Sequence, residues 1–318
     1  MTNFASLFAV RIVAFLEYRV ARGFKKETHL RHFIKFDCWC AEHQPGKTNL
    51  TRELVHNWID DSTASANDIS SRAVCMRQFG KYLGAIGEEA YILPNKYAPI
   101  KNKAVPYIFT DYELTALFAS IDKLPSTKSE PFLNEIAPTL FRLIYTCGLR
   151  PNEGRDLPVD NVNLETGEIL ITRTKRNRER LVVMSDDMLG LARKYDSRRR
   201  IFGKNSAQFF PSLNGEAMKS AAVYSVFNKA WSGADLPGKY PRSVRVYDLR
   251  HRFASACLNR WLDNGENLMA MLPFLREYMG HGTLAETAYY IHILPENIVK
   301  SSAIDWDKFN AMFPEVAK

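Results

Sequence analysis

The chain has 318 residues, of which 46% are hydrophobic and 25% charged, and its net charge is +8. This length suggests about two domains of ~100–200 residues each, and the composition is typical of globular domains with buried cores. No apolar run approaches the ~18 residues that would span a bilayer, which excludes an ordinary membrane helix. The basic charge favours a nucleic-acid partner, because neutralised phosphates release counterions, but charge alone does not decide it.

The N-terminal stretch is apolar enough to raise the question of a signal peptide. Arg11, Glu17 and Arg19 interrupt it, no charged segment precedes it, and no small-residue cleavage site follows. An amphipathic helix fits this pattern better, so we expect a cytoplasmic protein with no membrane contact.

The five cysteines form no CxxC motif, which disfavours a disulfide framework or a zinc ribbon. Cys38, Cys40 and His43 lie close together in CWCAEH and could be read as metal ligands. Cys38 and Cys40 fall on different helix faces and only three ligands are present, so small apolar helix residues are the better interpretation. We therefore predict no metal.

Residues 1–98 read as a helical domain. The apolar spacing predicts four helices. The first runs over about 4–21, the second starts at Thr28 as N-cap, the third runs through LTRELVHNWI, and the fourth starts near Ser70. Basic side chains occur along these helices, and taken alone they indicate a solvated face: Arg31, Lys35, Arg72, Arg77 and Lys81.

A linker is predicted over 99–106, within the proline- and lysine-containing stretch LPNKYAPIKNKAVP. Proline disfavours a helical conformation at the residue before it, so this stretch should be extended. Lys101 and Lys103 could then follow a phosphate backbone.

Residues 107–318 predict a mixed α/β domain. Helices are expected at 111–122 and 134–146. NVNLETGEILITRTK has a Thr-Gly turn between two short apolar runs, and ERLVVM is a further β-rich run. Helices follow to the end of the chain.

Four short stretches of this second domain carry candidate chemistry. In YTCGLRPNEGRDL an apolar helix ends at Gly148, Arg150 follows in the turn, and Glu153 can support that arginine or cap the next helix. In TKRNRERLVVM, Lys175 lies at the tip of a predicted turn. Singly, each is an ordinary feature of a globular domain.

In VYDLRHRFAS, Asp248 is the expected helix cap and Arg250 lies in the first turn, where free N–H groups favour an anion. YMGHGTLAETAYYIH contains His281 and, nine residues later, Tyr290. Tyr289 precedes it directly, but adjacent helical residues point about 100° apart, so only one tyrosine can face a given site.

Together these stretches resemble the motifs of the tyrosine recombinases, also called the phage integrase family. TCGLRPNE is similar to the first arginine motif, KRNRERLVVM to the KGNKERLVPL-type hairpin, YDLRHRFAS to HDLRHTFAT, and the last stretch to LGHSSISTTQIYTH. The resemblance covers nearly the whole chain. It implies a mostly α-helical fold with a small β-sheet: a helical, SAM-like core-binding domain and a catalytic domain that close on DNA as a C-shaped clamp.

The resemblance also implies site roles. Tyr290 would be the nucleophile, with Thr287 matching the motif threonine before it. Arg150, Arg250 and His281 would hold the phosphate, Lys175 would protonate the leaving 5′-oxygen, and Glu153 and His251 would support them. Arg176 and Arg178 would contact DNA beside Lys175, and the basic side chains of residues 1–98 would become phosphate contacts.

The sequence departs from the family pattern at Tyr247, where the family has histidine or sometimes lysine. A phenol can hydrogen-bond a phosphate oxygen, but its pKa near 10 makes it a poor base at neutrality. Pro273 is expected to interrupt a helix, which resembles a transposon-associated branch more than the Xer-type enzymes.

The resemblance further implies a metal- and ATP-free, cofactor-free recombinase acting on double-stranded recombination sites at the nucleoid. It would work as a homotetramer, alone or with related recombinases. The tail, about 294–318, would contact a neighbouring protomer through apolar residues, or else pack on its own domain. A type IB topoisomerase and a DNA-binding accessory protein that has lost cutting remain alternatives; Tyr247 favours the latter.

Overall fold

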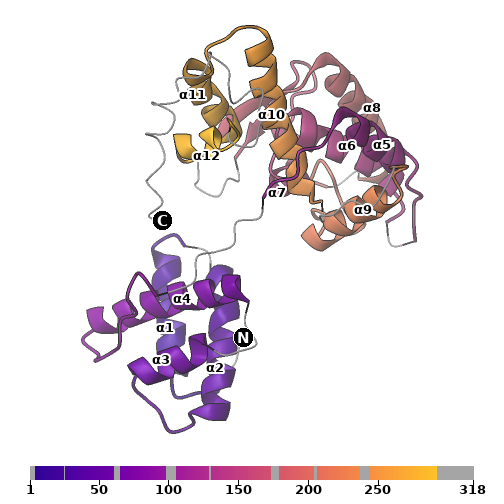
Figure 1. The fold of residues 1–318 in the computed structure, drawn as a ribbon. Helices are drawn as coiled ribbons and strands as arrows, with labels where there is room; N and C mark the ends of the chain where they lie inside the picture. Colours follow the sequence, from indigo (N-terminus) through magenta and orange to yellow (C-terminus); the bar gives the residue numbers. More distant parts are fainter. Residues whose placement is uncertain are drawn as a thin grey trace. The chain divides into compact units, whose positions relative to one another are not determined.

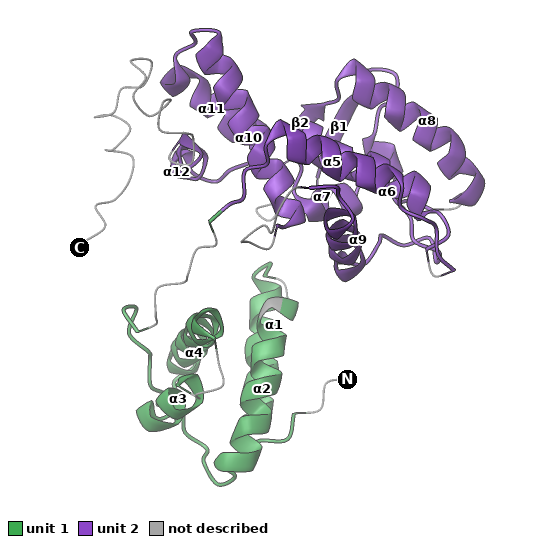
Figure 2. Ribbon diagram, turned by 45° about the vertical axis from the view of Figure 1, so that its right-hand side comes forward, with its two compact units in different colours: residues 1–105 green, residues 106–318 purple. Residues whose placement is uncertain are grey.

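A computed structural model of the chain describes residues 4–24, 26–60, 65–97, 105–128, 130–172, 179–203, 206–236 and 244–291. The chain divides into two compact units, Met1–Val105 and Pro106–Lys318 (Figure 2). Helices dominate both units, and the described β-structure is a two-stranded sheet, as the sequence predicted. No described helix is long and apolar enough to cross a membrane.

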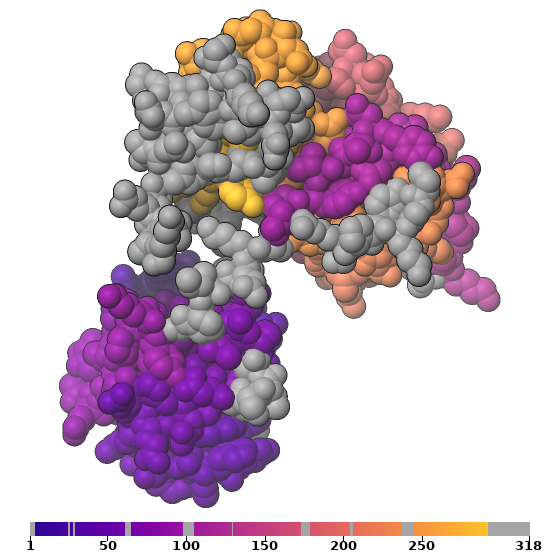
Figure 3. Space-filling view, viewed as in Figure 1, coloured from indigo at the N-terminus to yellow at the C-terminus, as the bar shows by residue number. Residues whose placement is uncertain are grey.

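The first unit is helical (Figure 1). Its helices are α1 (Ala9–Ala21), α2 (Glu27–His43), α3 (Arg52–Ile59) and α4 (Ala66–Ala85). Aromatic rings hold them together: Phe15 of α1 contacts Phe33 of α2 and Phe79 of α4, with ring centroids 5.4 Å from each. Such edge-to-face and tilted pairs add to the area that burial removes from water. In Figure 3 the described residues of this unit are coloured from indigo to magenta.

The predicted helix starts in this unit need three corrections. α1 begins at Ala9 rather than near Phe4, because the Asp37 carboxylate accepts the backbone N–H groups of Ala5 and Ser6. α2 begins at Glu27, so Thr28 lies inside it. α4 begins at Ala66, where the Ser65 side chain accepts the Asp68 N–H and caps the helix before Ser70. α3, expected within LTRELVHNWI, begins at Arg52, and the Thr51 side chain accepts the Leu54 N–H and caps it.

The second unit starts with α5 (Asp111–Asp122) and α6 (Leu133–Thr146), close to the predicted ranges. A capping box of Thr110 and Glu113 fixes the start of α5. The remaining elements run in chain order: α7 (Pro151–Arg155), the 3₁₀ turn η1 (Val159–Asn161), β1 (Glu168–Ile171), β2 (Arg180–Val183), α8 (Asp186–Phe202), α9 (Ser220–Ser232), α10 (Val246–Asp263), α11 (Leu268–Met279) and α12 (Leu284–Ala288).

The small sheet differs from its predicted pairing. β1 pairs antiparallel with β2, in the register Glu168↔Val183. Across the Thr-Gly turn there is only an isolated bridge, Val162↔Ile169, so the partner of β1 comes from ERLVVM rather than from NVNL. Ile169 and Val182 are buried in the main core of the unit, whereas Leu181 and Val183 face outward.

A second apolar cluster of this unit joins α10, α11 and the segment after α12. Leu258, Leu272, Met279 and Ile291 are buried within it. Pro273 lies inside α11, and the helix continues through it, which corrects the predicted interruption. The surrounding packing outweighs the single backbone hydrogen bond that proline removes.

Candidate active site

The corner between α6 and α7 presents Arg150. Gly148, with φ of 59°, turns the chain after α6, and Arg150 stands at the N-cap position of α7. Glu153 has both roles that the sequence offered. Its Oε2 accepts the Arg150 backbone N–H at 2.8 Å, and its Oε1 accepts Nη1 of the Arg150 guanidinium at 2.6 Å.

Arg180, the first residue of β2, was not singled out from the sequence. Its Nη1 and Nη2 donate to Oε1 and Oε2 of Glu153 at 3.0 and 2.6 Å. Glu153 is buried, and its carboxylate pairs with both Arg150 and Arg180. Burial alone would raise the pKa of Glu153, but the Arg180 and Arg150 contacts outweigh it and lower this pKa to about 2.

α10 carries the second candidate arginine. Arg245 is the N-cap and Asp248 is the third helical residue, closing a capping box, so Asp248 is not the cap itself. Arg250 therefore lies beyond the first turn. Its side chain is 0% exposed, and burial lowers its pKa. The nearest carboxylate contact is long, 4.0 Å from Nη1 to Oε2 of Glu153.

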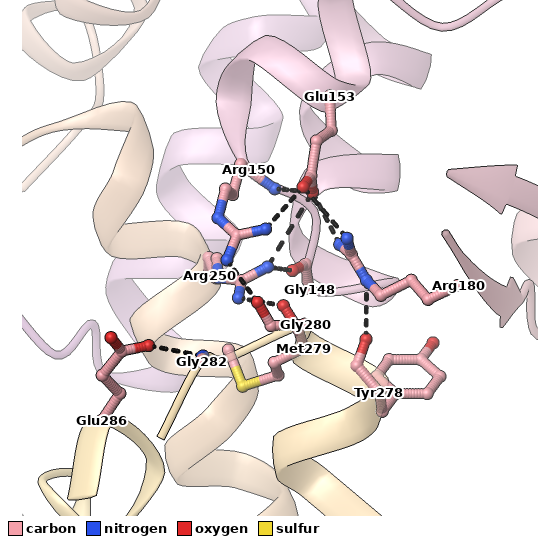
Figure 4. A network of polar contacts seen from close by, with 10 residues as sticks. All are labelled: Gly148, Arg150, Glu153, Arg180, Arg250, Tyr278, Met279, Gly280, Gly282 and Glu286. Atoms are coloured by element: carbon pink, nitrogen blue, oxygen red, sulfur yellow. Dashed lines mark hydrogen bonds and ion pairs between the residues drawn. The ribbon is translucent and has the colours of Figure 1, made fainter. Parts of the chain in front are cut away.

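Three arginines converge on the end of α11 (Figure 4). Arg180 Nε donates to the Tyr278 carbonyl at 2.8 Å, Arg250 Nη2 to that of Met279 at 2.5 Å, and Arg150 Nη2 to that of Gly280 at 2.7 Å. Carbonyls at a helix C-terminus lack helical partners and carry partial negative charge, which suits guanidinium donors. Gly280, with φ of 63°, ends the helix there.

His281 follows this end directly. Its Nδ1 lies 2.8 Å from Oγ1 of Thr287, and both residues are buried. Burial lowers the pKa of His281 to about 3, with Arg250 and Arg150 acting in the same direction, so the ring is neutral near pH 7.

The two adjacent tyrosines differ in environment. Tyr290 is 3% exposed, and its hydroxyl lies 3.0 Å from Nδ1 of His251, whereas Tyr289 is partly exposed. Burial raises the pKa of Tyr290, and the nearby Arg250 guanidinium opposes this rise. The Tyr247 ring packs on His251 at 4.9 Å between centroids. The structure thus gathers Arg150, Arg250, His281, Tyr290, Tyr247, His251 and Glu153 around one site.

The predicted DNA-contacting side chains of the first unit separate into two groups. Arg31, Lys35 and Lys81 are exposed. Arg72 is buried, with Nη1 donating to the Trp58 carbonyl and Nε to Asp68, which corrects its expected place on a solvated face. Arg77 also makes hydrogen bonds within the unit, because its guanidinium donates to the carbonyls of Leu93 and Pro94.

Several predictions fall outside the described residues: Lys101, Lys103, Lys175, Arg176, Arg178 and the tail over 294–318. Among the described residues, no group of three or more His, Cys, Asp or Glu side chains could hold a metal ion. Cys38 is exposed and Cys40 buried, so these two neighbours do not face the same environment.

A family model with the description Phage integrase family matches residues 109–297, which include the seven residues gathered around the candidate active site. The chain belongs to the phage integrase family. It is an enzyme of the tyrosine-type site-specific recombinases. The family match thus agrees with the resemblance that the four motifs carry.

Relatives within the family align over most of the chain. The integrase/recombinase y4rE of Sinorhizobium fredii is 27% identical over 298 residues, which are 92% of this chain and 93% of that protein. The tyrosine recombinase XerD of Rhizobium meliloti is 29% identical over 261 residues, 80% of this chain and 79% of that protein. These two relatives do not test the predicted resemblance to a transposon-associated branch, which stays a prediction.

Solved structures of a site-specific recombinase and of an integrase share the fold. The XerH site-specific recombinase in a post-cleavage complex with its difH substrate has a TM-score of 0.64 and 19% identity, and the match covers 89% of this chain and 80% of that one. A lambda integrase dimer bound to a core site has a TM-score of 0.63 and 14% identity, covering 88% and 94%.

Proposed function

We propose that this phage integrase family member cuts and rejoins DNA at recombination sites through a covalent 3′-phosphotyrosine on Tyr290. The observation that carries the proposal is a buried tyrosine that lies in the same site as a cluster of arginine side chains. Arg150, Arg180 and Arg250 gather around one carboxylate, that of Glu153. The excess positive charge suits a phosphodiester, and planar guanidinium groups match its oxygens.

Arg250 offers the clearest donor for that anion. Its Nη1 and Nη2 are used by the carbonyls of Gly148 and Met279, but its buried Nε has no hydrogen-bond partner among the described residues. A buried unpaired donor is costly, so an incoming phosphate oxygen would relieve it. In the transition state, where negative charge grows, such preorganised donors contribute most.

The reaction then follows from these groups. The Tyr290 oxygen attacks phosphorus, the bond to the 5′-oxygen breaks, and the phosphotyrosine conserves the energy for rejoining, so that no ATP is needed. Lys175 would be the proton donor for the 5′-oxygen, a role that rests on its position in the motif alone. His281 would hydrogen-bond a phosphate oxygen. These side chains would supply the positive charge that other phosphoryl-transfer enzymes take from a metal.

The wider arrangement is also proposed. The first unit and the second would close on opposite sides of double-stranded DNA, with Arg31, Lys35 and Lys81 on phosphates. Four copies on two sites would carry out an exchange, joined through the tail over 294–318. On this proposal the protein acts in the cytoplasm, on nucleoid DNA.

The deciding experiment is covalent trapping. The full chain is mixed with nicked duplexes from the ends of the genetic element that encodes it, and protein–DNA adducts are resolved on a denaturing gel. We expect an adduct that Tyr290→Phe abolishes and Tyr289→Phe preserves. Loss in Tyr289→Phe alone would assign the nucleophile to Tyr289. Tight DNA binding without any adduct would favour the accessory protein, and relaxation of supercoiled DNA without a defined site would favour a topoisomerase.

A further inference from the structure

We propose that His251 is a catalytic residue of this chain: its imidazole Nδ1 takes the proton from Tyr290 when the tyrosine attacks. The inference rests on the proposed function. It concerns the step that the family pattern leaves open here, because Tyr247 occupies the position where the family has histidine or lysine.

The geometry places an acceptor on the reacting oxygen. Nδ1 of His251 lies 3.0 Å from the Tyr290 hydroxyl, within the range that proton transfer requires. The two ring centroids are 5.5 Å apart, and both residues are largely buried, so bulk water does not replace this contact.

The neighbouring groups are less suited to the role. His281 stacks on the Tyr290 ring at 6.0 Å, but its Nδ1 is engaged with the Thr287 hydroxyl. The Tyr247 side chain ends in a phenol, whose hydroxyl serves as a hydrogen-bonding group rather than as a general base, and its ring packs on His251. Arginine side chains remain protonated and cannot accept one. His251 is thus the base that this site presents to Tyr290.

The other side of the imidazole supports the required tautomer. To accept at Nδ1, the neutral ring must carry its hydrogen on Nε2, and Nε2 faces the buried Asp248 carboxylate, with Oδ1 at 3.9 Å. That carboxylate would stabilise the imidazolium formed by proton transfer. This order of nucleophile, base and orienting carboxylate is the general logic of an activated hydroxyl.

The charged groups around His251 set when it can act. Burial lowers its pKa to about 4, Asp248 opposes this, and Arg245 and Arg250 add to it, so the ring is neutral and ready to accept at pH 7. His281, Tyr247 and Tyr290 are its other titratable neighbours. A phosphodiester bound between the arginines offsets their charge, which raises the basicity of the imidazole once the substrate is in place.

The step balances without a further reactant. The Tyr290 proton moves to Nδ1, the phenolic oxygen bonds to phosphorus, and the bond from phosphorus to the 5′-oxygen breaks. The departing oxygen takes its proton from the acid on its own side, the role given to Lys175. In rejoining, the 5′-hydroxyl gives its proton back to the acid that supplied it and attacks phosphorus. The bond from phosphorus to the Tyr290 oxygen breaks, and the imidazolium returns its proton to that oxygen.

The test compares His251→Ala and His251→Gln in the trapping assay, with DNA affinity measured in parallel. Glutamine can still hydrogen-bond Tyr290 but cannot accept its proton near pH 7. General-base loss typically costs about 10²–10⁴-fold in rate. We expect cleavage by both variants to fall in that range with DNA affinity kept, and their rates to rise towards pH 9 while that of the parent chain levels off.

Two further measurements separate base from acid and from packing. A substrate with sulfur at the 5′-bridging position needs no acid for its leaving group, so it should not rescue His251→Gln. Tyr247→His, which restores the family histidine, should rescue His251→Ala at least tenfold. Parental rates in His251→Gln, or no rescue together with an unchanged pH profile, would overturn the proposal. An inactive parent chain would instead count against the proposed function itself.

Discussion

The Arg180 guanidinium and the Glu153 carboxylate form a two-pronged ion pair, with N–O distances of 3.0 and 2.6 Å. Both side chains are buried, at 7% and 3% exposure. Because Glu153 also pairs with Arg150, the β2 strand is linked to the candidate phosphate-binding arginine through a single carboxylate.

Arg180→Met should therefore destabilise the second unit. It leaves part of the Glu153 charge buried without its partner, and breaking a buried pair costs about 3–5 kcal/mol. Chemical denaturation of the full chain measures this. The control is Arg198→Met. Arg198 pairs with Glu135, but the Arg198 side chain is 51% exposed, so this substitution should cost about 0–1 kcal/mol. Equal effects of the two substitutions would argue against a structural role for Arg180.

The low pKa of Glu153 predicts an acid-dependent stability. Its folded pKa is about 2, below the ordinary value near 4.5, so the carboxylate stabilises the fold fully above pH ~4.5. That contribution is lost as the pH falls through about 2. Glu153→Gln should be less stable than the parent chain at pH 7 by about 3 kcal/mol, since each pKa unit corresponds to about 1.4 kcal/mol. The difference should shrink steadily below pH ~4.5; a constant difference would contradict it.

Gly148→Ala should be costly for two separable reasons. The left-handed backbone at φ of 59° costs about 1–2 kcal/mol for a residue with a Cβ, and that Cβ would also overlap the Phe253 ring. Gly265→Ala is the matched control, because its φ is 73° and nothing lies within 4 Å of the added atom. The excess loss in Gly148→Ala, measured by thermal unfolding, is the packing cost, expected at about 1–3 kcal/mol.

Arg72 and Lys81 should separate stability from DNA affinity. Arg72 stacks on Trp58 at 5.1 Å and is buried, so Arg72→Ala should lower the unfolding midpoint of the first unit. Lys81 is exposed, so Lys81→Ala should leave that midpoint unchanged and reduce the salt dependence of DNA binding by about one phosphate contact. A loss of stability without loss of binding in Lys81→Ala would exclude the proposed contact.

Local signals in the sequence were read well where the structure depends on neighbours along the chain. The sequence allows Glu153 to support Arg150 or to cap α7, and in the structure its carboxylate does both, through contacts across three residues. The same local reasoning predicts Asp248 as the helix cap, whereas the N-cap is Arg245, three positions earlier. The capping box puts an acidic residue at the third helical position, and this residue resembles a cap in the sequence.

Contacts between distant segments were not predictable in this way. Arg180 stands inside a quoted motif, yet nothing in that motif shows that its partners are Glu153 and the Tyr278 carbonyl. Arg72 looked like one more basic residue on an exposed face until the packing of α4 on Trp58 was known. The motif predicts a supporting role for His251, because its contact with Tyr290 joins positions 39 apart in sequence and cannot be read from the motif.

The three carbonyls at the end of α11 have a consequence for how the protein is made. Arg150 and Arg180 reach their carbonyls across 130 and 98 residues of chain, and Arg250 joins Gly148, 102 residues before it, to Met279. A nascent chain in which α11 has not yet been synthesised therefore lacks the carbonyl groups that align its arginines. We expect the capacity to break DNA to arise only after α11 has been synthesised, so that shorter copies of the chain should lack it.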